Sequence, residues 1–113
     1  MTDEELKAII GESEGKIQTR IINYLEGLDY IVIRHNAGYV KSNVKLSPKF
    51  TPDLQIIMFD SKSLWIEVKQ PGKDLSDGQR DMKADLESRG QRVIVAHSLD
   101  DVKTMLRIGT TPL

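Results

Sequence analysis

The chain has 113 residues, of which 39% are hydrophobic and 29% charged, with a formal net charge of −1. This length fits one domain, and the composition is that of a folded globular protein rather than a disordered one. Cysteine is absent, which excludes a disulfide framework, a zinc ribbon and a thiol nucleophile. No apolar run approaches the roughly 18 residues that a membrane span needs, and the acidic start is not that of a signal peptide. We therefore expect one soluble, cytoplasmic domain over residues 1–113.

Two helices are predicted at the start of the chain. Thr2 and Glu5 form a capping box for a short helix over residues 1–11. Ser13 can cap a second helix, which would end near residue 27. The apolar residues of this second helix recur at helical spacing and comprise Ile17, Ile21, Leu25 and Leu28. The apolar run Tyr30–His35 that follows predicts a buried strand.

A basic segment separates this strand from the next one. No acidic residue lies between Asp29 and Asp53, and the four cations of that window are Arg34, Lys41, Lys45 and Lys49. They leave a net charge of −5 on the rest of the chain. Basic residues with interleaved aromatic ones are typical of surfaces that bind a phosphate backbone, although a solvated lysine-rich loop has the same pattern. We expect an exposed basic loop or hairpin over residues 39–50.

The second half of the chain alternates strands and helices. Leu54–Phe59 and Leu64–Lys69 predict a hairpin of two strands. Ser76 and Gln79 form a second capping box, and the helix that they begin would end at Gly90.

An apolar strand over Arg92–His97 and a last helix capped by Ser98 complete the prediction. The strand–helix–strand unit from Leu64 to His97 should be a right-handed, parallel crossover. The fold class is therefore α/β, with a small mixed β-sheet flanked by helices.

One group of residues suggests chemistry, namely Pro52-Asp53 followed by Glu67-Val68-Lys69. Strand alternation places Trp65, Glu67 and Lys69 on one face. Two charges in a mostly apolar strand are costly unless they are paired or bound to a ligand. A structural ion pair or a solvated sheet face would also account for them.

The predicted hairpin brings a second carboxylate to the same face. If Asp60–Lys62 is a three-residue loop, Gln55 pairs with Glu67 and Asp53 with Lys69. Asp53 and Glu67 are then diagonal neighbours whose carboxylates can converge on one divalent ion. Carboxylates, a backbone carbonyl and water suit a hard cation such as Mg²⁺. The Lys69 ammonium can hold the attacking water and offset charge on a phosphoryl group.

Six motifs, in this order and spacing, resemble the virus-type replication-repair nuclease (VRR-NUC) domain of the PD-(D/E)XK nuclease superfamily. They are Glu14-Gly-Lys-Ile-Gln18, Arg34-His-Asn-Ala-Gly38, Thr51-Pro-Asp53-Leu, Trp65-Ile-Glu67-Val-Lys69-Gln-Pro-Gly72, Leu75-Ser-Asp-Gly-Gln79 and the stretch from Gly90 to Asp101. The resemblance implies a restriction-endonuclease-like α-β-β-β-α-β core. One departure is that members often carry a glycine just ahead of Pro-Asp, where this chain has Phe50-Thr51.

The resemblance also implies roles for individual residues. Asp53 and Glu67 would be metal ligands together with the Val68 carbonyl, and Lys69 would orient or activate the attacking water. Glu14 would reach the metal through water or a second ion, although a glutamate in a first helical turn also suits the helix dipole.

The remaining assignments from the resemblance concern a glutamine and the DNA. Gln79 would hold Lys69 or a phosphate oxygen, in addition to its place in the capping box. His35 and Asn36 would contact the DNA backbone beside the basic residues, and His97 is expected to be a strand-end residue rather than a ligand.

These observations predict a Mg²⁺- or Mn²⁺-dependent DNA endonuclease that acts on structured or branched DNA. Stand-alone members of this size look like phage or bacterial proteins that pair as dimers in the manner of Holliday-junction resolvases, so we expect a homodimer. Two alternatives stay open. The chain could be a catalytically inactive nucleic-acid-binding module of the same fold, or a protein-interaction domain with a buried ion-pair network.

Overall fold

A computed structural model describes residues 13–35 and 48–109 of the chain. The predicted helix over residues 1–11 and most of the basic segment, residues 39–47, lie outside the described residues. The elements in chain order are α2 (Glu14–Gly27), β1 (Ile31–Arg34), β2 (Leu54–Ile57), β3 (Ser63–Val68), α3 (Asp77–Ser88), β4 (Arg92–Ala96) and α4 (Leu99–Gly109).

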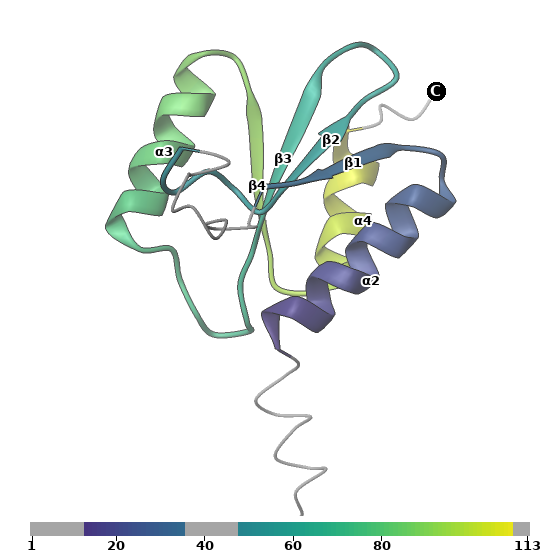
Figure 1. Cartoon of the computed structure of the whole chain (residues 1–113), viewed down its shortest axis with the longest axis horizontal. Helices are drawn as coiled ribbons and strands as arrows, with labels where there is room; N and C mark the ends of the chain where they lie inside the picture. The colour runs from purple at the N-terminus through teal and green to yellow at the C-terminus, as the bar shows by residue number, and fades with distance from the viewer. Residues whose placement is uncertain (1–12, 36–47, 110–113) are drawn as a thin grey trace, which may run out of the picture.

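The four strands form one mixed sheet in the order β1-β2-β3-β4. β1 with β2 and β2 with β3 are antiparallel, whereas β3 and β4 are parallel and joined through α3. α2 and α4 cover one face of the sheet, and α3 lies on the other (Figure 1). The predicted α/β class, the mixed sheet and the parallel crossover are confirmed.

The core lies between the sheet and the helix pair α2 and α4. Side chains of alternate strand positions meet the apolar stripe of α2 there, because successive strand residues point to opposite faces. The buried core residues comprise Ile17, Ile21, Leu25, Leu54, Ile56, Leu64, Ile66, Val68, Ile94, Ala96 and Val102. The alternation predicted for β3 is thus correct, since its even-numbered residues face the core.

α2 begins where the sequence predicts but ends one residue short of its last predicted core position. The Ser13 hydroxyl accepts a hydrogen bond from the Lys16 amide at 3.3 Å and caps the helix. Leu28 is the residue after the last turn and is 46% exposed. Leu28, the last residue of the predicted apolar stripe, does not share the burial of the other three, because helical spacing no longer applies past the helix end.

The sequence predicts a buried β1, and this prediction is also wrong. β1 is an edge strand in which the side chains of Ile31 and Ile33 are 64% and 39% exposed. These two residues point to the face that carries α3, but α3 packs on β4 at the opposite edge of the sheet. These side chains are exposed because α3, the helix on this face, covers the β4 side of the sheet and does not reach β1.

The β2–β3 hairpin has a longer turn than the sequence predicts. Ile57 pairs with Ser63 and Gln55 with Trp65, so the loop runs from Met58 to Lys62. The Met58 amide donates to the Lys62 carbonyl oxygen at 2.8 Å and closes that loop. The predicted pairing of Gln55 with Glu67 is therefore wrong by two positions. A shift of two keeps every side chain on its predicted face.

Both predicted caps in the second half of the chain are present. In the capping box of α3, the Ser76 hydroxyl accepts from the Gln79 amide and the Gln79 side chain accepts from the Ser76 amide. The Ser98 hydroxyl accepts from the Asp101 amide at the start of α4. Among the described residues, no helix has the length and apolar character to cross a bilayer.

Candidate metal centre

Asp53 and Glu67 lie side by side at the end of the hairpin that is remote from its turn. Continuing the observed register by one residue places Asp53 opposite Glu67 rather than diagonal to it. Asp53 Oδ2 accepts a hydrogen bond from the Val68 amide at 2.8 Å, which fixes the carboxylate of Asp53 against β3. Glu67 is 6% exposed. The structure thus brings together the two carboxylates that the sequence predicted as metal ligands.

The two carboxyl groups share an environment that disfavours two negative charges. Burial raises the pKa of Glu67 to about 8, and the charge of Asp53 and a hydrogen bond with Asp53 contribute to that rise. Burial also raises the pKa of Asp53, while the hydrogen bond from the Val68 amide opposes that rise. At neutral pH the pair therefore retains a proton, which a cation can replace.

The donor set fits a hard divalent cation. Oxygen ligands from Asp53, Glu67 and a backbone carbonyl leave the remaining coordination positions to water, as Mg²⁺ prefers. In the two described stretches, no group of three His, Cys, Asp or Glu side chains is close enough to hold a metal ion. The negative charge of Glu14 nevertheless raises the pKa of both carboxyl groups, so Glu14 acts on the pair from outside direct ligand distance.

Gln79 is held between its helix cap and the carboxylate pair. Its amide nitrogen donates to Glu67 Oε1 at 3.2 Å, while its amide oxygen accepts from the Ser76 amide at 2.9 Å. The predicted capping role of Gln79 is thus present, and the same side chain also contacts a carboxylate of the candidate site. The side chain that Gln79 contacts is Glu67, whereas the sequence pointed to Lys69 or a phosphate oxygen.

Lys69 is half-buried and follows Glu67 on the same face of the sheet. Its positive charge lowers the pKa of both Asp53 and Glu67, although burial outweighs it. The Lys69 amide donates to the Ala96 carbonyl at 3.0 Å, which holds this end of β3 against β4. The backbone of Lys69 is therefore anchored at the end of β3, and its charge acts on both carboxylates from there.

The predicted DNA-contacting residues are only partly within the described part of the chain. Asn36, Lys41 and Lys45 lie outside it. The Arg34 guanidinium donates to Gln18 Oε1 at 3.4 Å, on the face that carries α2 rather than on that of Glu67.

His35 and Lys49 both precede Asp53 in the chain and lie within the described residues. The His35 amide donates to the Asp53 carbonyl at 2.8 Å, and its ring centroid lies 5.3 Å from that of Trp65. The Lys49 ammonium lies 5.0 Å from the centroid of the Phe50 ring.

Two polar residues of the hairpin have contacts that the sequence does not predict. Gln55 Oε1 lies 2.8 Å from His35 Nε2, and Gln55 Nε2 donates to the Ser63 hydroxyl at 2.9 Å. This chain of hydrogen bonds crosses from β1 to β3 on the face of Glu67. The sequence does carry a signal for these contacts, because Gln55 is a polar residue in an otherwise apolar strand and lies two positions from Asp53, on the same face of the sheet. His97 follows β4, and its ring contacts the Gln70 carbonyl oxygen, as expected of a strand-end residue.

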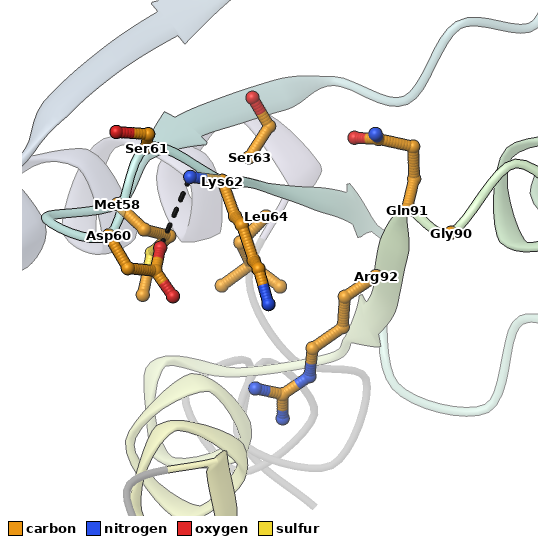
Figure 2. A pocket seen from close by; sticks show the side chains of 9 residues that line it. All are labelled: Met58, Asp60, Ser61, Lys62, Ser63, Leu64, Gly90, Gln91 and Arg92. Atoms are coloured by element: carbon orange, nitrogen blue, oxygen red, sulfur yellow. Dashed lines mark hydrogen bonds between the residues drawn. The ribbon is translucent and has the colours of Figure 1, made fainter.

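A pocket of about 390 Å³ lies at the opposite end of the hairpin and does not contain any of the predicted site residues (Figure 2). It is lined by the β2–β3 turn and the start of β4, including Lys62 and Arg92. Arg92 also donates to the Met105 carbonyl oxygen of α4 at 2.8 Å. The carboxylate pair is therefore separated from this pocket by the length of β3.

Comparisons with known proteins identify the fold and the family of this chain. A solved structure described as a VRR_NUC domain matches with a TM-score of 0.65 and 21% sequence identity, over 83% of this chain and 94% of that one. At this identity the match shows the shared fold. A search of curated protein sequences gave no match. A family model for the VRR-NUC domain matches residues 13–100. These residues include both carboxylates, Lys69 and Gln79, and the chain belongs to the VRR-NUC family of nuclease domains.

Proposed function

We propose that the chain is a Mg²⁺- or Mn²⁺-dependent DNA endonuclease. The observation that carries this proposal is the adjacent pair of half-buried Asp53 and buried Glu67, in which desolvation raises the pKa of both carboxyl groups. Such a pair is unfavourable as two bare anions and favourable around a divalent cation. A purely structural ion pair would place a cationic side chain, rather than a second acid, against Glu67.

Each residue of the site has a role in this proposal. Asp53, Glu67 and the Val68 carbonyl would hold the ion, which when bound would supply a Lewis acid for the scissile phosphate and for the attacking water. Lys69 orients that water and offsets negative charge on the phosphoryl group. Gln79 keeps Glu67 in its ligand orientation through the bond to Oε1. Glu14 acts on the ion through water.

The residues of the proposed DNA interface all precede Asp53 in the chain. Arg34, His35, Asn36, Lys41, Lys45 and Lys49 contact phosphates and set the register of the DNA rather than read bases. The described cation closest in sequence to Asp53 is Lys49.

We propose further that two copies act together on branched or structured DNA, since symmetric cleavage of a junction needs two sites related by a two-fold axis. On the edge strand β1, Ile31 and Ile33 expose apolar surface that a second copy of the chain can cover. Light scattering at micromolar concentration should give twice the 12.8 kDa mass of the chain. A monomer mass at all concentrations contradicts the paired arrangement.

The test of the endonuclease proposal is cleavage of duplex, flap and four-way-junction DNA with Mg²⁺ or Mn²⁺ and with EDTA. The wild-type protein should cut only with metal, and Asp53→Asn and Glu67→Gln should reduce cutting to background. Glu26→Gln, which changes an exposed carboxylate of α2, is the matched control and should cut normally. Metal-dependent DNA binding without any cleavage would favour the inactive binding module instead.

A further inference from the structure

Phe50 adopts a backbone conformation that its residue type rarely takes. Its φ is 65°, in the left-handed region that suits glycine, and it lies three residues before Asp53. The turn that contains it is closed by Thr51, whose amide and hydroxyl donate to the Pro48 carbonyl oxygen at 3.2 and 2.6 Å. A contact elsewhere must favour Phe50 at a position where glycine would fit without strain.

That contact is with Gly78 in the first turn of α3. A Cβ added to Gly78 would collide with three ring carbons of Phe50, so the ring occupies the space of the side chain that glycine lacks. An open groove of about 280 Å³ lies beside this contact and is lined by Phe50, Gly78 and Met82, and the Phe50 side chain remains 41% exposed. Glycine weakens a helical turn, so its presence at position 78 calls for a reason, and the close approach of the Phe50 ring supplies one. In turn, the contact with Gly78 accounts for a phenylalanine in the strained conformation at position 50.

The contact joins the two segments that support the carboxylate pair. Phe50 leads through Pro52 into Asp53, and Gly78 is adjacent to Gln79, whose amide holds Glu67. Lys49, 5.0 Å from the Phe50 ring, is carried on the same turn. Movement of the turn relative to α3 would therefore separate Asp53 from Gln79 and displace a cation at the same time.

We propose that Phe50 and Gly78 form a latch, and that Phe50 is a positioning residue which holds the Pro48–Asp53 segment against α3. The latch sets the position of Asp53 relative to the Gln79–Glu67 pair and fixes where Lys49 meets DNA. Its catalytic consequence rests on the proposed function, but its effect on the position of Asp53 does not.

The direct test is hydrogen exchange in the metal-free protein, read at two neighbouring amides. The Val68 amide donates to Asp53 Oδ2, whereas the Lys69 amide donates to the Ala96 carbonyl of β4. Phe50→Gly removes the ring and keeps a residue that suits the left-handed turn. We expect exchange at Val68 to accelerate by about tenfold or more while exchange at Lys69 is unchanged. Unchanged protection of Val68 would overturn the latch.

Gly78→Ala tests the same contact from the helix side. Its methyl group collides with the Phe50 ring, so Val68 should lose protection as in Phe50→Gly. In the double variant the methyl group has space, and exchange at Val68 should match that of Phe50→Gly alone. Gly27→Ala is the control, because a Cβ there meets nothing within 4 Å. If the two single effects add in the double variant, the contact is not a latch.

Mn²⁺ titration calorimetry then connects the latch to the metal site. Phe50→Gly and Gly78→Ala should each weaken Mn²⁺ binding by about 10-fold, at temperatures well below unfolding. Wild-type affinity in both variants overturns the positioning role. Failure of the wild-type protein to bind Mn²⁺ overturns the proposed function instead, and the exchange measurement still decides the latch.

Discussion

Glu67 is the one buried ionisable side chain among the described residues. It is 6% exposed, next to a second acid, with the Gln79 amide as a neutral hydrogen-bond donor. A group in this position is more easily protonated in the folded protein than in the unfolded chain, where its pKa is 4.5. Its protonation is therefore linked to folding.

The first prediction is that the metal-free protein loses stability as pH rises. Because the pKa of Glu67 is about 8 in the folded state and 4.5 in the unfolded state, the folded state binds more protons between those values. The free energy of unfolding should then fall by up to about 1.4 kcal/mol for each pH unit across this window. Urea unfolding in EDTA at pH 5 to 9 measures it. Glu67→Gln should flatten the profile, whereas Glu26→Gln should retain it.

The second prediction separates the role of Lys69 from that of the carboxylates. Lys69→Met keeps the apolar stem and removes the charge, so we expect turnover to fall by about 10²–10³-fold with a much smaller change in Mn²⁺ affinity. Single-turnover cleavage and calorimetry measure the two effects. Lys62→Met, in the hairpin turn, is the control. Equal losses of turnover and affinity would make Lys69 structural.

At the scale of elements, α3 has both a folding signal and a site residue in its first turn. Ser76 and Gln79 complete the capping box, and only Gln79 also reaches Glu67. A cap stabilises the helix whether or not a metal is bound, whereas the bond to Glu67 orients a carboxylate that we propose as a metal ligand. The two functions can be separated by substitution.

The third prediction uses this separation. Ser76→Ala should cost about 1 kcal/mol of stability and leave cleavage nearly unchanged, as should Ser98→Ala at the cap of α4. Gln79→Ala should cost similar stability and in addition lower Mn²⁺ affinity by about 10–100-fold. Denaturation and calorimetry on the three variants decide this. A Gln79→Ala protein with wild-type affinity would reduce Gln79 to a cap.

The elements were predictable from the sequence where the signal was local. The caps at Ser13, Ser76 and Ser98 depend on residues three or four positions apart, and all three are present. The exposure of β1 was not predictable, because it depends on how far α3 extends across the sheet. The hairpin register failed because apolar Met58 and Phe59 resemble strand residues, whereas they lie in the turn, with Phe59 packed on Tyr30.

The placement of the candidate site residues was likewise predictable where it depends on local sequence. Asp53, Glu67 and Lys69 follow from spacing and alternation, which survive a register shift of two. Which residue Gln79 contacts, and the packing of Phe50 on Gly78, depend on the placement of α3 over the sheet. No pattern in the sequence encodes that placement directly.

At the scale of the whole molecule, charge is segregated along the chain. The basic segment carries no acid, and the remainder has an excess of negative charge. DNA affinity that depends on such a segment should reflect counterion release, in proportion to the phosphates contacted.

The fourth prediction concerns this segment. Changing Lys41, Lys45 and Lys49 to glutamine should weaken DNA binding and reduce the salt dependence by about one unit of slope for each phosphate that the variant no longer neutralises. Changing Lys62, Lys83 and Lys103 instead alters the net charge equally and should leave the slope unchanged. Fluorescence anisotropy across a range of salt concentrations measures both. Equal slopes in the two triple variants would remove the basic segment from the interface.

Asp53 and Glu67, the proposed metal ligands, belong to one hairpin, and this has a consequence for how the protein folds. Hairpins form early because their loops are short, whereas β1 and β4 must join β2 and β3 across longer stretches of chain. We therefore expect Asp53 and Glu67 to meet before α3 supplies Gln79. Their repulsion would oppose this early step at alkaline pH, and a bound divalent cation would relieve it. Magnesium should then accelerate refolding more than it slows unfolding, so that the ion assists the folding of its own site.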